Sequence, residues 1–166
     1  MKKSIKEILH DHQEVLTTRG RIDRLFNMVA PCRVTVGGSY MLKYWCEAFS
    51  ERTISDYDFI LHAKRVDMVQ IKDFIDVLGK LTHITKMKYY NNPSICMGSL
   101  MGRPVNILFK EDECKSFGVF ESIEDIIEVK KSWCEKALKE GRDPRPKDLE
   151  DIATYEGWLA ENDLPF

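Results

Sequence analysis

The sequence predicts a mixed α/β fold, in which a mixed β-sheet is flanked by helices and followed by a C-terminal pair of helices. Two observations predict this class. Short alternating apolar runs are interspersed with helical periodicity through the first part of the chain, and two longer amphipathic stretches follow. We expect an α/β core over residues 1–118 and C-terminal helices over 119–166 packed on it, as two domains or as one.

The first expected elements are helices on either side of Gly20, over residues 4–17 and 24–30. Residues 32–36 alternate and are β-branched, so they predict a short strand. Gly37-Gly38 ends it, and apolar residues at helical spacing predict a helix over 38–50. The remaining core elements are expected to be a strand over 57–62, a helix over 66–81, and strands over 84–90, 94–100 and 104–109.

Two helices complete the expected order. Ser122, with Asp125 three residues later, resembles a capping box that starts a helix reaching about residue 139. A polar break follows, and the last helix is expected to begin near Pro146 and to end near Asp163. We expect the large indole rings of Trp45 and Trp133 to lie in the core.

Composition narrows the classes of function. The 166 residues can bury a sizeable core, and a formal net charge of -2 gives no global sign of affinity for nucleic acid or membranes. No apolar run approaches about 20 residues, and the N-terminus does not resemble a signal peptide. Five cysteines without a CxxC pair indicate reduced thiols rather than disulfides or a zinc site, so we expect a cytoplasmic protein.

An acidic pair lies inside an apolar run. Side chains alternate along a strand, so Asp56 and Asp58 share one face, while Tyr57 and Phe59 point to the core. Two carboxylates about 7 Å apart along a strand repel each other unless a cation lies between them. Hard oxygen ligands of this kind suit Mg²⁺. The alternative is an exposed edge strand with two ordinary surface acids.

Gly37-Gly38-Ser39 lies between a predicted strand and a predicted helix. This arrangement offers backbone N–H groups and a hydroxyl to an anion, and the glycines allow a phosphate to approach the backbone closely. The alternative is a tight turn in which Ser39 caps the helix. A phosphate site beside a metal pair would hold a nucleoside triphosphate with Mg²⁺.

Three motifs then occur in order: Gly37-Gly38-Ser39, the segment RTISDYDF at residues 52–59, and RPKDLEDI at residues 145–152. Together they resemble the signature of the nucleotidyltransferase superfamily, which has a polymerase beta-like fold, and are most similar to its AbiEii-type branch. The resemblance implies transfer of a nucleoside monophosphate from an NTP to a hydroxyl of an RNA such as tRNA, a protein or a small molecule. It also implies a possible antitoxin-like protein partner.

The resemblance assigns roles to residues across the chain. It implies that Asp56 and Asp58 hold Mg²⁺ or Mn²⁺. The implied nucleotide-binding residues are Gly37, Gly38, Ser39, Arg52, Lys130, Lys147 and Asp148. Two of them have simpler interpretations: Lys130 lies on the apolar stripe of its helix and could extend its amine to water, and Lys147 could form an exposed ion pair with Asp151.

The strand over 104–109 carries Asn106 at the position where this superfamily usually has a third carboxylate. Asparagine has no negative charge and cannot act as a base. Three interpretations are open. The protein works with two carboxylates and recruits Glu111 or the acceptor itself; it binds nucleotide or a partner without catalysis; or Asn106 replaces an aspartate to trap a complex.

Overall fold

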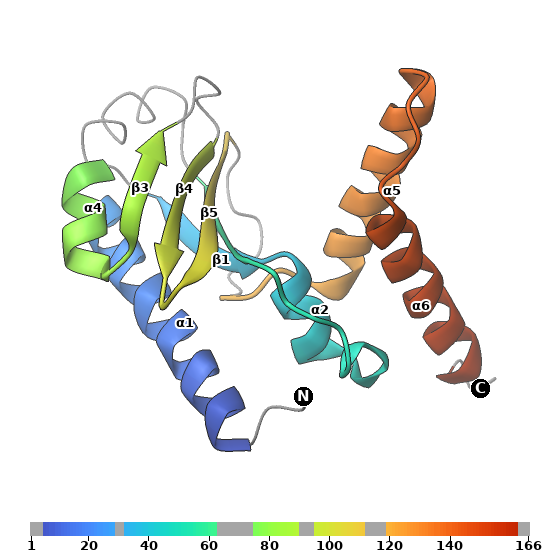
Figure 1. The fold of residues 1–166 in the computed structure, drawn as a ribbon, viewed down its shortest axis with the longest axis horizontal. Coiled ribbons are helices and arrows are strands. Elements are labelled where there is room, and N and C mark those ends of the chain that lie inside the picture. The colour runs from blue at the N-terminus through green and yellow to red at the C-terminus, as the bar shows by residue number, and fades with distance from the viewer. Residues whose placement is uncertain (1–4, 29–31, 63–74, 90–94, 112–118, 163–166) are drawn as a thin grey trace. The chain divides into compact units, whose positions relative to one another are not determined.

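The computed structural model describes residues 5–28, 32–62, 75–89, 95–111 and 119–162 (Figure 1). The chain divides into two compact units: unit 1 contains residues 1–40 and 53–120, and unit 2 contains residues 41–52 and 121–166. Unit 1 holds a mixed sheet with helices, and unit 2 is helical. The predicted mixed α/β class is therefore confirmed, while the predicted domain division at residues 118 and 119 stays a prediction.

The sheet of unit 1 has five strands in the order β1-β2-β5-β4-β3. Strands β2 and β5 pair in parallel, and the other neighbours are antiparallel. Met101 and Gly102 connect β4 to β5 with positive φ at both residues, as in the turns that favour hairpins. The strands are β1 (Arg33–Gly37), β2 (Tyr57–His62), β3 (Thr85–Tyr89), β4 (Ile95–Leu100) and β5 (Arg103–Lys110).

Helix α1 (Ile5–Asn27) runs without a break through Gly20, so the prediction of two helices was wrong. Val15, Ile22 and Phe26 are buried at helical spacing on both sides of the glycine. Burial of such side chains, at about 1.5–3 kcal/mol each, outweighs the cost of about 1 kcal/mol for a glycine inside a helix.

Helix α4 (Ile75–Thr82) supplies the second described helix that packs in unit 1. It contacts β3 and α1, and α1 also packs against β1. Figure 1 shows α1 and α4 beside the sheet. The helix expected over residues 66–81 is confirmed in its last part, and residues 66–74 lie outside the described residues.

Alternation along the strands determines which side chains form the core. Tyr57, Phe59 and Ile107 are almost completely buried. Asp58 and Asn106 are offset by one residue from these positions and therefore project from the opposite face of the sheet. Both are only partly buried. The buried face of β2 and β5 thus fixes the strands whose other face carries Asp58 and Asn106.

The first helical segment that leads into unit 2 is shorter than expected. Helix α2 (Ser39–Trp45) ends before Cys46, whose backbone is extended, and a 3₁₀ turn η1 (Glu47–Phe49) follows. Cys46 and Phe49 are buried. The chain breaks at the point where these two side chains are buried. The prediction of one helix over residues 38–50 was therefore wrong.

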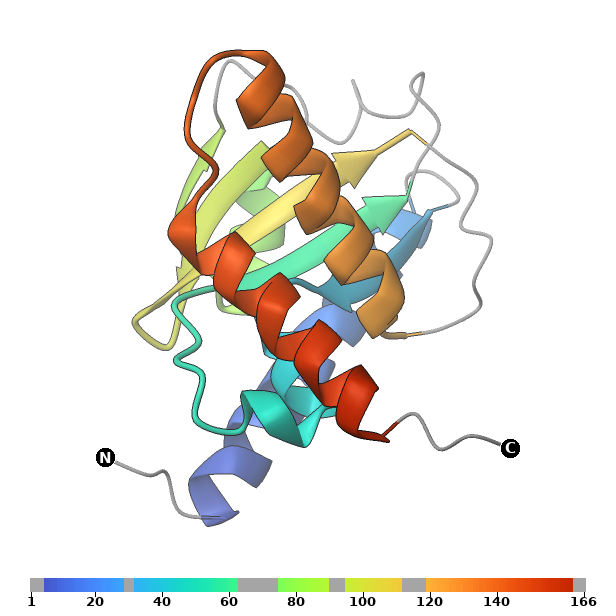
Figure 2. The ribbon, with the colours of Figure 1, turned by 90° about the vertical axis from the view of Figure 1, so that its right-hand side faces the viewer.

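Helices α5 (Ile123–Lys139) and α6 (Pro146–Asn162) make up most of unit 2 and lie side by side (Figures 1 and 2). The backbone N–H of Asp125 donates to Ser122 Oγ over 3.2 Å, which confirms the predicted N-cap. Pro146 is the first helical residue of α6, as expected. In the described part of the chain, no helix is long and apolar enough to cross a membrane.

Two tryptophans are not in the core, contrary to the prediction. Trp45 is 47% exposed and Trp133 is 50% exposed. Within unit 2, the indole N–H of Trp45 donates to the Glu121 carbonyl over 2.8 Å, and the Arg145 guanidinium lies 5.1 Å from the centre of the Trp133 ring. An indole needs a polar partner or access to water, which favours the surface for both rings.

The cysteines that the structure describes are Cys32, Cys46, Cys96 and Cys134. All four are free and buried, as the sequence predicted. Burial raises the pKa of the Cys96 thiol to about 11. Cys114 lies outside the described residues.

Candidate functional site

Three of the polar positions of interest form one row across the sheet of unit 1. Gly37 on β1 is the Cα partner of Asp58 on β2, and Asp58 is the Cα partner of Asn106 on β5. The β2–β5 pair is parallel, and β3 and β4 lie between these two strands in the sequence. Strand pairing therefore brings together residues from three separate segments and fixes them on neighbouring backbones.

Gly38 follows the row directly and has a conformation that only glycine adopts easily. Its φ is +69°, and a Cβ at this position would lie 1.9 Å from Asp58 Oδ2. The Asp58 carboxylate is thus packed against the Gly38 backbone. The second glycine of the Gly37-Gly38 pair is required by the close approach of this aspartate, whatever else binds there. Ser39 comes next, buried in the first turn of α2.

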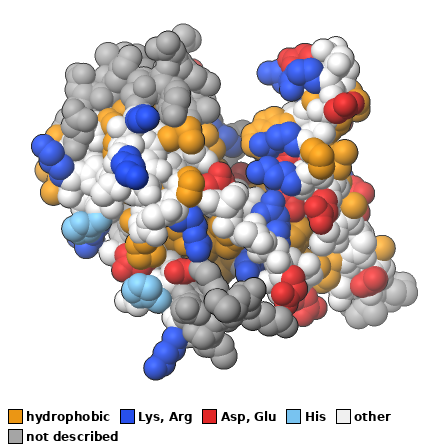
Figure 3. Space-filling model, in the orientation of Figure 1, with side chains coloured by type: hydrophobic (Ala, Val, Ile, Leu, Met, Phe, Trp, Pro, Cys, Tyr) orange, Lys and Arg blue, Asp and Glu red, His pale blue; other side chains and the backbone are white. Residues whose placement is uncertain are grey.

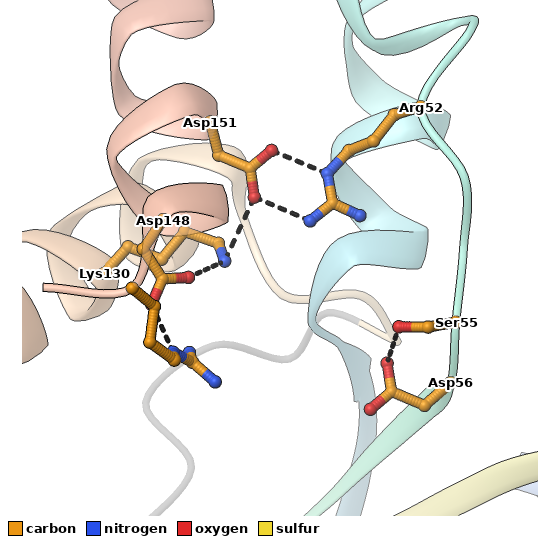
Figure 4. A network of polar contacts seen from close by, with 7 residues as sticks. Arg52, Ser55, Asp56, Lys130, Asp148 and Asp151 are labelled. Atoms are coloured by element: carbon orange, nitrogen blue, oxygen red, sulfur yellow. Dashed lines mark hydrogen bonds and ion pairs between the residues drawn. The ribbon is translucent and has the colours of Figure 1, made fainter.

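The aspartate cluster, which we define as Asp56, Asp58 and Asn106, is joined by hydrogen bonds from the Asn106 carboxamide. Asn106 Nδ2 donates to Asp56 Oδ2 over 3.0 Å and to Asp58 Oδ1 over 2.9 Å. Ser55 Oγ also donates to Asp56 Oδ1 over 3.3 Å, as Figure 4 shows. An ionised carboxylate only accepts hydrogen bonds, so the NH₂ group of Asn106 is the end that faces the pair.

Tyr57 anchors β2 from the other face. Arg103 Nη1 donates to the Tyr57 hydroxyl over 2.7 Å, and the Arg103 guanidinium lies 5.0 Å from the centre of the same ring. The centres of the Tyr40 and Tyr57 rings lie 5.6 Å apart, with the ring planes nearly perpendicular. Burial raises the pKa of Tyr57, and the Arg103 cation opposes this only in part. A strand anchored in this way directs Asp56 and Asp58 away from the core.

The side-chain atoms of the aspartate cluster can be compared with the ligands that a divalent cation prefers. Within the described residues, no group of three or more His, Cys, Asp or Glu side chains could hold a metal. Two carboxylates on one face nevertheless suit Mg²⁺, which takes one or two carboxylates and fills its shell with phosphate and water. The Asn106 carboxamide also has an oxygen, although its NH₂ group faces the pair here. The set fits one cation bound by two carboxylates.

Unit 2 contains a second group of charged residues, the charge network, defined as Arg52, Lys130, Arg145, Asp148 and Asp151. Lys130 is 5% exposed, and its Nζ lies 2.7 Å from Asp148 Oδ1 and 3.1 Å from Asp151 Oδ2. Arg52 binds Asp151 with two parallel hydrogen bonds of 2.6 and 2.8 Å (Figure 4). Arg145 Nε donates to Asp148 Oδ2 over 2.6 Å. The network joins the 41–52 segment to α5 and α6 inside unit 2.

Electrostatics within the network favour the charged form of Asp148. Burial acts to raise the pKa of Asp148, but hydrogen bonds from Lys130 and Arg145 outweigh it and hold that pKa below its ordinary value. Buried carboxylates and cations persist when they are paired in this way. The side chain of Lys130 therefore does not extend to water, contrary to one of the two interpretations from the sequence.

Lys147 behaves differently from its neighbours on α6. It is exposed, while Asp148 and Asp151 are buried. The expected Lys147–Asp151 ion pair is wrong, because Asp151 pairs with Arg52 and Lys130. The sequence reasoning missed Asp151 and Arg145 as members of this group. The available signal was the spacing of Asp148 and Asp151, three residues apart on a helix, which places both on one face.

The residues assigned from the sequence thus fall into two sets. Unit 1 brings together Gly37, Gly38, Asp56, Asp58 and Asn106, with Ser39 next to Gly38 in the chain. Unit 2 brings together Arg52, Lys130 and Asp148 and leaves Lys147 exposed. On the face drawn in Figure 3, both basic and acidic side chains lie over the C-terminal helices. The roles of all these residues in binding or catalysis stay predictions.

Comparison with models of known protein families and with curated protein sequences gives no match for this chain.

Proposed function

We propose that this chain is a metal-dependent nucleotidyltransferase that transfers a nucleoside monophosphate from an NTP to an acceptor hydroxyl. One observation carries the proposal: Gly37 of the glycine turn and Asp58 of the aspartate pair, from separate motifs in the sequence, are cross-strand partners, and the Asp58 carboxylate lies against Gly38. Phosphate binding and cation binding at one place are what a nucleoside triphosphate with Mg²⁺ requires. We place the reaction in the cytoplasm, where buried cysteines stay reduced.

In this proposal, Asp56 and Asp58 hold Mg²⁺ or Mn²⁺, which offsets the negative charge of the phosphates when it is bound. Backbone N–H groups near Gly38 and the Ser39 hydroxyl orient the triphosphate. The acceptor oxygen attacks the α-phosphorus, the bond between the α-phosphorus and its bridging oxygen breaks, and pyrophosphate leaves. The reaction depends on positioning and charge more than on a reactive side chain.

The proton of the acceptor hydroxyl does not go to Asn106, because a carboxamide is not a base at neutral pH. Glu111 is exposed but lies five residues beyond Asn106 along an extended strand, about 16 Å away at the rise of a β-strand, so the proton passes to solvent instead. The resemblance to the nucleotidyltransferase superfamily is the only support for a role in nucleotide binding for four further residues, Arg52, Lys130, Lys147 and Asp148. Three of these four are already engaged in the charge network, and Lys147 is the one with an exposed charge.

The test is transfer of label from α-labelled NTPs to a cell extract, with Mg²⁺ or Mn²⁺. We expect a labelled product with at least one of the four NTPs, and the fraction that carries the label identifies an RNA, protein or small-molecule acceptor. Asp58→Asn should lower the rate by about a hundredfold or more, because it removes a charge from the site. Asp143→Asn, in the exposed break between α5 and α6, is the matched control and should keep activity. No product with any NTP rejects the proposal.

A second function is favoured by the hydrogen bonds of Asn106. A carboxamide that bridges both aspartates and cannot act as a base is suited to a non-catalytic relative that binds nucleotide or a partner protein. Asn106→Asp separates the two functions. If only the variant transfers nucleotide, the starting protein is a binding module. If the starting protein is active and the variant adds nothing, the second function is rejected.

A further inference from the structure

The Asn106 carboxamide lies where a cation would be most favourable. Its two N–H bonds are divided between two carboxylates, at 3.0 Å from Asp56 and 2.9 Å from Asp58. The carboxamide donates to one oxygen of each carboxylate and itself brings no net charge to the pair.

The backbone keeps this side chain in place. Asn106 is the Cα partner of Asp58 in the parallel β2–β5 ladder, and its neighbours Val105 and Ile107 are fully buried. Besides rotation about the Cα–Cβ bond, the side chain can rotate about the bond between Cβ and the carboxamide, a torsion with broad, roughly two-fold preferences. Rotation by half a turn exchanges Nδ2 and Oδ1 with almost no change in shape.

We propose that Asn106 is a two-sided ligand of the aspartate cluster, with an orientation that depends on the metal. Its NH₂ group faces the carboxylates when no cation is present and takes the place of the cation. Its Oδ1 faces the same point when a divalent cation binds, because three oxygens would repel one another without one. The inference rests on the metal site of the proposed function, but it does not require catalysis.

Two consequences distinguish this role from a merely structural one. Metal binding must break two charge-assisted hydrogen bonds, so the affinity of the protein for Mg²⁺ alone is lower than that of a site with three carboxylates. The metal must also change the environment of the Asn106 NH₂ protons, which lose their carboxylate partners. A structural asparagine would keep both hydrogen bonds in the presence of metal.

The experiment uses the full chain labelled with ¹⁵N at asparagine and titrated with MgCl₂ without nucleotide. The NH₂ signals of Asn106 are those that disappear in Asn106→Asp. We expect Mg²⁺ to shift this pair and to accelerate its exchange with water. Asn162, whose Nδ2 donates to the Trp158 carbonyl over 2.8 Å on α6, provides an internal control that should not respond.

The variant provides an independent readout. Asn106→Asp should lower the melting temperature in the absence of metal, because it places a third carboxylate beside two others. Its affinity for Mg²⁺, measured by calorimetry, should exceed that of the starting protein by about tenfold or more. Unchanged Asn106 signals up to saturating Mg²⁺, or equal Mg²⁺ affinities of the two proteins, overturn the proposal. If the Asn106 signals shift but no nucleotide is transferred, this inference stands and the proposed function is rejected. If nucleotide is transferred but the signals do not change, the proposed function stands and this inference is rejected.

Discussion

In the charge network of unit 2, two aspartates meet three basic side chains, whereas in the aspartate cluster of unit 1 two aspartates meet a neutral carboxamide. In the first arrangement each aspartate pairs with two basic side chains, and Lys130, Asp148 and Asp151 are buried. In the second, Asp56, Asp58 and Asn106 are each only partly buried, and the donor that they share carries no charge. Paired and buried charges mainly stabilise a fold, whereas partly buried polar groups can also meet a ligand.

The comparison predicts that similar substitutions in the two groups change the stability of the fold in opposite ways. Neutralising a member of the charge network leaves a buried partner without its counter-charge, which is costly. Neutralising the aspartate pair removes repulsion, so the unliganded fold should keep its stability.

The largest effect is expected for Lys130→Met. Because Lys130 Nζ is shared by Asp148 and Asp151 and is almost completely buried, the variant should lose about 3 kcal/mol of the free energy of unfolding. Denaturant unfolding measures the change. Lys131→Met is the matched control, because Lys131 is the next residue and forms an exposed pair with Glu156, and its unfolding midpoint should not change. Equal midpoints for both variants would show that the network does not stabilise unit 2.

A smaller loss is expected for Gly38→Ala. The variant places a methyl group against the Asp58 carboxylate and forces a side chain into positive φ. We expect a loss of about 2–3 kcal/mol in the free energy of unfolding, measured by denaturant titration. Gly102→Ala tests the backbone cost alone, since Gly102 has a φ of +75° but open space around its Cβ position, and it should lose about 1 kcal/mol. Equal losses would mean that the Asp58 contact does not restrict position 38.

The smallest effect is expected in the pH dependence of the free energy of unfolding. The pKa of Asp148 in the folded protein is below its ordinary value of 3.8, so the unfolded state binds protons more readily. The stability from this carboxylate is therefore present above pH 3.8 and is lost as the pH falls through the lower, folded-state pKa. Asp148→Asn should be less stable at pH 6 but should lose less on acidification, in unfolding experiments between pH 6 and about pH 3. Asp143→Asn should follow the starting protein, and a parallel loss in Asp148→Asn would contradict the assignment.

The elements of the fold were largely predictable, because they depend on local patterns. Alternation identified β2 and β5, and Ser122 with Asp125 marked the start of α5. The break at Cys46 and the uninterrupted α1 were not predictable from spacing. Each depends on which apolar side chains the tertiary structure buries, such as Ile22 and Phe26 beyond Gly20.

The candidate site was predictable as a set of residues but not as a set of contacts. Alternation placed Asp56 and Asp58 on one face, but the register that sets Asn106 opposite Asp58 comes from pairing between strands that are not consecutive. The partners of Asp151 were missed for the same reason. A spacing of four suggested Lys147, whereas the fold supplies Arg52 and Lys130 from other segments of unit 2.

The central claim is that the aspartate cluster binds a metal with a nucleotide, and the most direct test is the melting temperature with and without Mg²⁺ and a non-hydrolysable NTP. At a hundredfold excess over its dissociation constant, a ligand stabilises the fold by about 2.7 kcal/mol, which is a shift of about 5–10 °C for a chain of this size. The account predicts that Asp56→Ala combined with Asp58→Ala abolishes this shift and keeps the unliganded melting temperature or raises it slightly. A double variant that unfolds would show that the aspartates are structural, and one that retains the full shift would show that the nucleotide binds elsewhere.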